Sequence, residues 1–283
     1  FLTSSAPQCY DDCMRRVLFV VLLFSLFLLF SLFSSPVVAS SKQANQHYLY
    51  QLDVYSQTYT DFQVAKNEYE KFNSLTSQSG SLAKTISMLT QRDVMLKTYL
   101  FLLNEKLNED RGLSALEKQL YQTLIANEVK FLDEHAGRIP SIGALDDATD
   151  VSQELESHYN VLHASMRRII TGVYLGALAV ESRQFDTIIA ASRVLVSANR
   201  GVFTLDKQAI IDRWILQIDN KRSLYQQKIN AINSANSKLT GTSITDIDRN
   251  FTKILKDAGE AKQYMTEGTS YLGELVTALK YQD

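Results

Sequence analysis

The scarcity of proline after residue 40 constrains the fold of this chain more than any other feature. Of 283 residues only three are proline, and Pro140 is the only one after Pro36. Proline removes a backbone donor and breaks helix interiors, so a chain this poor in proline can sustain long helices. Apolar residues recur at steps of three and four along most of the same stretch. The sequence therefore predicts an all-α protein.

Helix-ending signals divide the chain after residue 40 into about seven segments. Glycine commonly follows the last turn of a helix, and glycines stand near the ends of five periodic runs: Gly80, Gly112, Gly137, Gly201 and Gly241. The predicted helices are 44–75, 82–110, 115–136, 150–182, 185–199, 205–240 and 246–281. We expect an elongated antiparallel helical bundle with coiled-coil-like packing, about seven helices following an N-terminal apolar segment.

Several segments carry more specific helix signals. Ser114 and Glu117 have the spacing of a capping box, and Thr204 is a predicted N-cap. The last segment has apolar or small residues at seven-residue periodicity, which predicts a continuous buried seam: Ile247, Phe251, Ile254, Ala258, Ala261, Met265, Gly268, Leu272, Leu275 and Leu279. The small-x-x-x-small step from Gly172 to Gly176 predicts close helix packing in water, because charged residues surround it.

The fourth and fifth segments resemble one tetratricopeptide helix pair. The resemblance rests on Leu175-Gly176, on Phe185-Asp186 and on the aliphatic Ile189 at that motif's spacing. Ile188 and Ser192 depart from the motif, and no second copy is visible, whereas solenoids need several repeats. The resemblance therefore implies only a helical hairpin with its turn between residues 182 and 185.

The N-terminal 39 residues predict an export signal. Met14 is a natural start before Arg15 and Arg16, so residues 1–13 are predicted to be an upstream or mis-called extension. An apolar run follows, and small residues end at Ala39, which together describe a signal peptide at 14–39 cleaved before Ser40. The alternative is an uncleaved membrane anchor at residues 17–35.

Both cysteines of the chain precede the predicted start. Cys9 and Cys13 lie before Met14, so the exported part contains no cysteine and no disulfide. We expect its stability to come from the core alone.

One long irregular connection is predicted between residues 138 and 149. It would divide a three-helix front, 40–137, from a four-helix back, 150–283, unless 40–283 is one continuous bundle. Asp146, Asp147 and Asp150 in and after this connection could hold a cation, but acidic residues also suit the positive N-terminal end of a helix. We favour the helix-end role.

The stretch from Tyr48 to Leu107 is predicted to form a helical hairpin that turns at Ser79 and Gly80. Each apolar series is interrupted once, by Lys66 in the first arm and by Asp93 in the second. The two interruptions lie at nearly equal distances from the predicted turn. We therefore expect Lys66 and Asp93 to form a register-fixing ion pair.

No catalytic or metal-binding motif is evident. The four histidines, His47, His135, His158 and His163, lack the spacing of a helical zinc site, and we expect them at the surface or at its boundary. Phosphate-binding loops and nucleophile elbows are absent as well. The net charge of −2, with both signs interspersed, argues against nucleic-acid binding. We expect no enzyme activity, no cofactor and no metal.

Tyrosines are concentrated in the first predicted helix: Tyr48, Tyr50, Tyr55, Tyr59 and Tyr69. Tyrosine can bury its ring and keep its hydroxyl in water, which suits a half-buried seam between helices. The same property suits contact with a ligand at a surface. We favour packing, with the five tyrosines as the candidate recognition surface in the alternative.

Export, periodic helices and the lack of catalytic motifs favour a structural or interaction module outside the cytoplasmic membrane of a bacterial cell. It would be secreted, periplasmic or at the cell surface, or else anchored by residues 17–35. Its partner would be an unknown protein or cell-envelope component, or a second copy of itself, and it would meet the membrane only through an uncleaved N-terminal segment. The alternative is an extracytoplasmic helical domain that binds a small molecule or glycan near the tyrosine-rich first helix.

Overall fold

A computed structural model describes residues 40–240 and 243–280 of the chain. The described residues are helical and contain no strand, which confirms the all-α prediction. Residues Ser41–Asp283 form one compact unit. No helix among the described residues is long and apolar enough to cross a membrane. The predicted signal or anchor, with its cleavage site after Ala39, lies outside the described residues.

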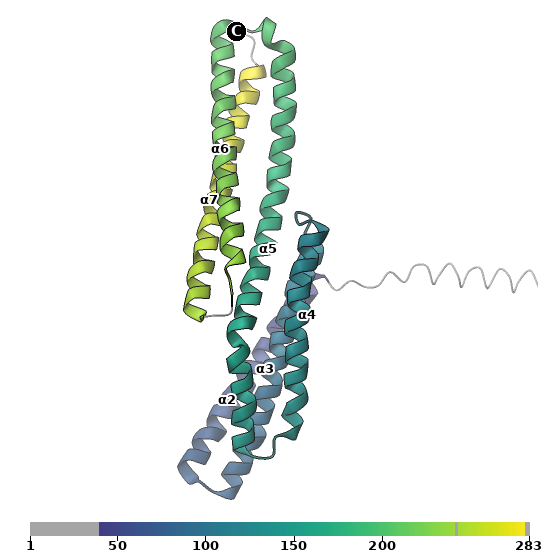
Figure 1. Ribbon diagram of the computed structural model, residues 1–283, viewed down its shortest axis with the longest axis vertical. Coiled ribbons are helices and arrows are strands. Elements are labelled where there is room, and N and C mark those ends of the chain that lie inside the picture. Colours follow the sequence, from purple (N-terminus) through teal and green to yellow (C-terminus); the bar gives the residue numbers. More distant parts are fainter. Residues whose placement is uncertain (1–39, 241–242, 281–283) are drawn as a thin grey trace, which may run out of the picture. The chain divides into compact units, whose positions relative to one another are not determined.

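Six α-helices and two short 3₁₀ helices make up the described residues (Figure 1). In chain order they are α2 (Ser41–Phe72), α3 (Leu75–Glu109), α4 (Ala115–Arg138), η1 (Ile139–Ser141), α5 (Leu145–Asn199), η2 (Arg200–Val202), α6 (Leu205–Ser237) and α7 (Ile244–Lys280). The capping box of Ser114 and Glu117 is present at the start of α4, and Thr204 caps α6 as predicted.

The predicted break between residues 182 and 185 does not exist. The two segments predicted there are one helix, α5, of 55 residues, so the tetratricopeptide-like hairpin is wrong. The buried stripe runs straight through the expected turn, since Ser182, Phe185 and Ile189 are all buried. Arg183 stays in the helix and donates to the carbonyls of Arg111 and Gly112 at 2.6 and 3.1 Å. A continuous apolar stripe outweighed the weak signals of a turn.

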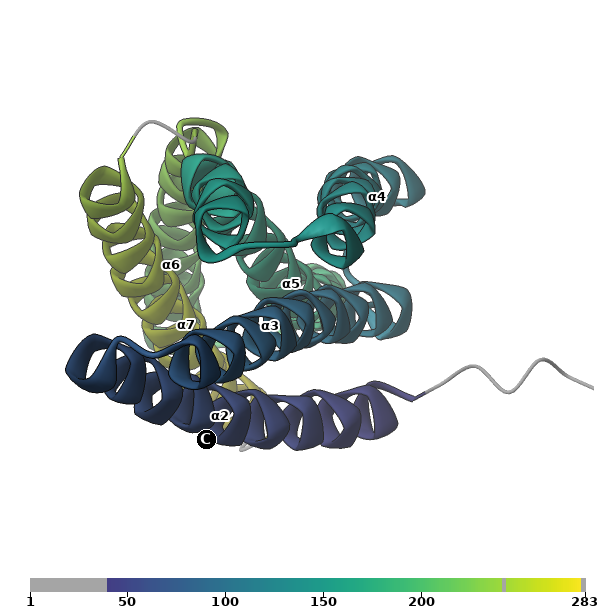
Figure 2. The same cartoon turned by 90° about the horizontal axis from the view of Figure 1, so that it is seen from below.

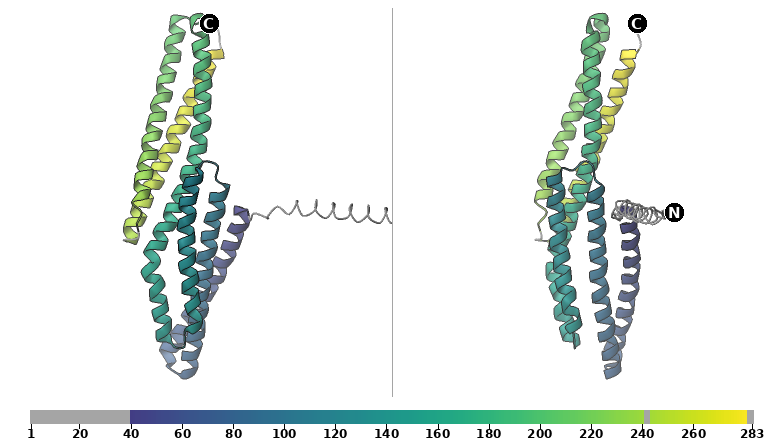
Figure 3. Two further views of the ribbon diagram at one scale, coloured as in Figure 1. Left: turned by 45° about the vertical axis from the view of Figure 1, so that its right-hand side comes forward. Right: turned by 90° about the vertical axis from the view of Figure 1, so that its right-hand side faces the viewer.

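Helix α5 contributes buried residues to the cores of both the front and the back (Figures 1 and 3). Its first part packs with α3 and α4 around a cluster that includes Leu100, Leu132 and Leu162. Its later part packs with α6 and α7 around Phe185, Ile218 and Met265. Eight of the ten predicted seam positions of α7 are buried, and Ala258 and Leu279 are partly buried against the core. The back is therefore built on three helices, with α5 shared between back and front.

The turn between α2 and α3 lies six residues earlier than predicted. Asn73 has a φ of 47°, in the left-handed region that asparagine tolerates, and Ser74 caps α3 through the amide of Ser77. Gly80 is inside α3. The turn is therefore made by Asn73 and not by the predicted Gly80. This changes which residues of α2 and α3 lie opposite each other.

The connection before α5 is shorter than predicted. Helix α4 continues to Arg138, and the 3₁₀ helix η1 leaves only residues 142–144 before α5 begins. A carboxylate oxygen of Asp147 accepts hydrogen bonds from the amides of Gly143 and Ala144, both at 2.9 Å. Asp147 therefore serves the start of a helix, as favoured from the sequence.

Two glycines let the loop after α3 touch α5. A Cβ atom at Gly112 would lie 1.7 Å from the carbonyl oxygen of Gly176, and one at Gly176 would meet the carboxylate of Asp110. One turn earlier, Gly172 faces the ring of Tyr121 from α4. The small residues at 172 and 176 thus permit close packing in water, as predicted.

The continuity of α5 predicts the effect of a proline at residue 184. Gln184→Pro should destabilise the fold by about 3 kcal/mol or more, because proline breaks a helix interior. Leu205→Pro is the matched control, since Leu205 is the exposed first residue of α6, where proline is tolerated. Urea unfolding followed by circular dichroism measures both. Equal, small losses for the two variants would mean that α5 has a turn near residue 184.

Candidate functional site

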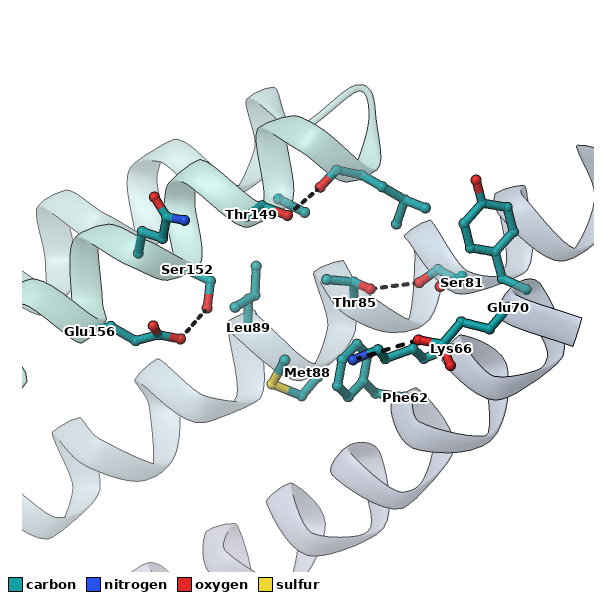
Figure 4. A pocket seen from close by; sticks show the side chains of 14 residues that line it. Phe62, Lys66, Glu70, Ser81, Thr85, Met88, Leu89, Thr149, Ser152 and Glu156 are labelled. Carbon is teal, nitrogen blue, oxygen red and sulfur yellow. Dashed lines mark hydrogen bonds and ion pairs between the residues drawn. The ribbon is translucent and has the colours of Figure 1, made fainter. Parts of the chain in front are cut away.

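A groove lies between α2, α3 and the beginning of α5. Its main pocket has a volume of about 400 Å³ (Figure 4). Phe62, Met88 and Leu89 give it an apolar floor, and Lys66, Glu70 and Glu156 supply charges. The groove exists because α2 packs chiefly against α3, while α4 and α5 lie on the other side of α3 (Figure 2).

A second pocket of about 250 Å³ continues along α3, lined by Tyr55, Arg92, Met95, Leu96, Leu155, Glu156 and Tyr159. Glu156 of α5 lines both pockets. On α3, Arg92 follows Leu89 of the main pocket by three residues, which is about one helical turn. The two pockets are therefore neighbours in one groove, and together they offer the volume of a typical small-molecule site.

Aromatic rings form a row along the groove side of α2. The ring centroids of Tyr55 and Tyr59 are 6.1 Å apart, and those of Tyr59 and Phe62 are 6.0 Å apart. Tyr55 is half-buried, and Tyr59 keeps 44% of its surface exposed. Rings at these separations offer flat apolar surface together with hydroxyl groups.

The structure brings three of the five predicted tyrosines to or beside the groove. Tyr55 lines the second pocket, Tyr69 lines the main pocket, and Tyr59 contacts the rings of its neighbours. Tyr48 instead packs against Tyr99 of α3, with ring centroids 4.9 Å apart. Tyr50 is 63% exposed and lies in neither pocket.

The predicted ion pair between Lys66 and Asp93 is wrong. Lys66 is exposed at the groove, where its Nζ lies 3.9 Å from Glu70. Asp93 is buried and pairs with His135 of α4 at 2.7 Å. The physical reason is the earlier turn at Asn73, which moves Lys66 opposite the region of Ser81 and Thr85 that lines the same pocket.

The Asp93–His135 pair lies in the interior, so the expectation of surface histidines is also wrong for His135. Nε2 of His135 donates to the carbonyl of Val151 in α5 at 2.9 Å, while Nδ1 faces a carboxylate oxygen of Asp93 at 2.7 Å. An imidazole that donates from both nitrogens carries a positive charge. This contact links α3, α4 and α5 through one charged side chain.

The pKa of His135 reflects two opposing effects. Burial and the charge of Arg92 lower it, but the hydrogen bonds to Asp93 and Val151 and the charge of Asp93 outweigh them, and the pKa is raised above its ordinary value of 6.5. Folding therefore favours the protonated form of the histidine.

A second buried carboxylate, that of Glu128, has partners for both of its oxygens. The two carboxylate oxygens of Glu128 accept hydrogen bonds from His158 and from Ser165, both at 2.8 Å. The ring of His158 stacks on Phe131, with centroids 3.7 Å apart. These partners join α4 to α5.

The four histidines contact other side chains or the backbone. Both ring nitrogens of His135 are occupied, and Nε2 of His158 is bonded to Glu128. His163 faces Asp248, and His47 contacts Gln51 at the exposed surface. Within residues 40–240 and 243–280, no cluster of three or more His, Cys, Asp or Glu is placed to hold a metal ion.

Arg92 is the groove residue that sequence reasoning missed. Its Nε and Nη2 atoms are buried and find no hydrogen-bond partner among the described residues. Burial lowers the pKa of Arg92, with Asp93, Tyr55 and Glu156 as opposing influences. The only feature of the sequence that pointed to Arg92 was its position next to Asp93, which lies on the predicted apolar seam of the second hairpin arm.

The chain matches no protein-family model, no curated protein and no solved structure. The assignment of a site therefore rests on the geometry of this chain alone.

The raised pKa of His135 predicts how stability changes with pH. Its protonated form favours the folded state, so this stabilisation is complete below about pH 6.5 and is lost as the pH rises through the raised pKa. Above pH 6, the free energy of unfolding of the wild type should therefore fall more steeply with pH than that of Asp93→Asn. The measurement is urea unfolding at several pH values.

The exposed histidine at residue 47 provides the control. His47→Gln should keep the pH dependence of the wild type, because His47 is exposed. If Asp93→Asn also keeps it, the charge of His135 does not depend on Asp93, and the assignment of a charged pair is wrong.

Proposed function

We propose that this chain is a helical binding module that acts outside the cytoplasmic membrane and catalyses no reaction. Its binding site is the groove between α2, α3 and α5, and its ligand is a small molecule or glycan with flat apolar surface. This favours the ligand-binding alternative of the sequence analysis, as a specific form of an interaction module.

The open groove is the observation that carries the proposal. A pocket of about 400 Å³ with an apolar floor falls in the size range of small-molecule sites. Apolar surface left open to water is unfavourable unless something covers it. The aromatic row of Tyr55, Tyr59 and Phe62 beside the pocket offers ring faces on which a planar molecule or a sugar can stack.

Export is supported by the sequence alone. Met14 is followed by Arg15 and Arg16, then by an apolar run and small residues up to Ala39. This order of regions is typical of a secretory signal, and an uncleaved anchor would place the same module at the membrane surface. In either case the cysteine-free remainder suits an environment in which thiols would oxidise.

The absence of catalysis is inferred from how the polar groups are used. The buried carboxylates Asp93 and Glu128 bind histidines and not a pocket, and neither lines the groove. In the main pocket the hydroxyl of Thr85 donates to the carbonyl of Ser81, and the hydroxyl of Ser152 donates to the carboxylate of Glu156 at 3.3 Å. No histidine or cysteine lines this pocket.

Binding of N-phenyl-naphthylamine, a neutral aromatic dye that fluoresces in apolar sites, tests the proposal. The full-length chain should bind it, and Ser152→Phe should weaken the binding about tenfold, because the added ring occupies the main pocket. Fluorescence titration measures the affinity.

The matched control is Ser157→Phe, the same change one and a half turns later on α5. Ser157 is exposed and lines neither pocket of the groove. Equal affinity of the dye for the wild type and for Ser152→Phe would show that the dye binds elsewhere, and the groove would lose its proposed role.

A further inference from the structure

We propose that Arg92 makes the groove selective for an anionic ligand, an apolar or aromatic molecule that ends in a carboxylate, sulfonate or phosphate group. This inference rests on the proposed function of the groove and names the chemical class of its ligand. The apolar body would lie in the main pocket, and the anionic end would bind the guanidinium in the second pocket.

The guanidinium of Arg92 has hydrogen-bonding capacity that the described residues do not use. Its Nε and Nη2 atoms are both buried without a partner. These two atoms lie on one edge of the guanidinium, which is the edge that binds two oxygens of a carboxylate or phosphate. A buried polar group without a partner is costly, so a ligand that supplies the partner recovers that cost.

The neighbouring acidic groups leave Arg92 unpaired. Asp93, the next residue, binds His135 of α4 through Oδ2, and its Oδ1 makes no hydrogen bond to Arg92. Glu156 lies across the second pocket and influences Arg92 electrostatically, but its carboxylate accepts a hydrogen bond from Ser152 at 3.3 Å and forms no ion pair with Arg92. Arginine stays charged even when burial lowers its pKa, so the positive charge persists in the pocket.

The other residues of the second pocket fit a molecule with a flat or aliphatic body. Tyr55 and Tyr159 provide rings on two sides, and Met95 and Leu96 provide apolar surface along α3. The hydroxyl of Tyr55 is a neutral neighbour, since burial raises its pKa despite the charge of Arg92. The pocket therefore places the guanidinium of Arg92 and the carboxylate of Glu156 among apolar walls, an arrangement that orients an amphipathic ligand.

Two dyes that share a ring system separate the anionic contact from apolar binding. N-phenyl-naphthylamine is neutral, and anilinonaphthalene sulfonate carries a sulfonate on the same skeleton. Arg92→Gln should weaken binding of the sulfonate about tenfold or more, because it removes a charge-assisted contact in a half-buried site. The same variant should change the affinity for the neutral dye by less than about twofold.

Two further variants extend the test: one should raise the affinity for the sulfonate dye, and the other should leave it unchanged. Glu156→Gln should strengthen binding of the sulfonate, because it removes a like charge from the second pocket. Arg168→Gln is the matched control, since Arg168 is another partly buried arginine of the front with an unpartnered Nε. It lies 12 residues beyond Glu156 on α5, about 18 Å along the helix, and should leave both dyes unaffected.

The outcomes distinguish this inference from the proposed function. Unchanged sulfonate binding in Arg92→Gln, with Ser152→Phe still blocking both dyes, would overturn the anion site and leave the groove as a binding site. Equal weakening of both dyes would also overturn it, because Arg92 would then only shape the pocket. If Ser152→Phe blocked neither dye, the proposed function itself would fail.

The wild-type protein provides a measurement that needs no variant. Raising the salt concentration should weaken the sulfonate more than the neutral dye, because ions screen the contact with Arg92. Equal salt dependence of the two dyes would contradict the anion site.

Discussion

The buried contact between Asp93 and His135 sets the arrangement of the front helices. It places a carboxylate of α3 against a protonated imidazole of α4, whose other nitrogen donates to the carbonyl of Val151 in α5. A buried charge that loses its partner costs several kcal/mol, so the three helices are aligned by the need to keep these atoms together. Contacts between leucines alone would allow one helix to shift by a turn along its neighbour at a smaller cost in free energy.

The same contact separates Asp93 from its neighbour Arg92. Adjacent residues of a helix project in different directions, and the Asp93 carboxylate enters the bundle toward His135. Arg92 instead lines the second pocket, and its Nε and Nη2 atoms have no hydrogen-bond partner among the described residues. The geometry of α3 thus leaves a guanidinium in the groove, and the proposed specificity of the groove depends on it.

The sequence predicted local features well and the positions of turns poorly. The buried seam of α7 and the caps of α4 and α6 follow from residues close in sequence, and these predictions are confirmed. The turn of the first hairpin was placed at Gly80, whereas Asn73 adopts the left-handed conformation. That shift made the pairing of Lys66 with Asp93 wrong, and with it the prediction of which charge is buried. Arg92 was missed because an unsatisfied donor is recognised only when its surroundings are known.

The groove stays open because of how α2 is attached to α3. Polar side-chain pairs join α2 to α3 at different points along the two helices. Gln91 donates to Gln51 at 2.6 Å, and Lys84 bonds to Asp61 at 2.7 Å. Ala65 is the only buried residue of α2, so this helix contributes little to the core. A fully apolar stripe on α2 would favour closure against α5, since burying it would gain about 25 cal/mol for each Å² removed from water. The mixed polar and aromatic surface of α2 instead keeps the hairpin in register and leaves the aromatic row available to a ligand.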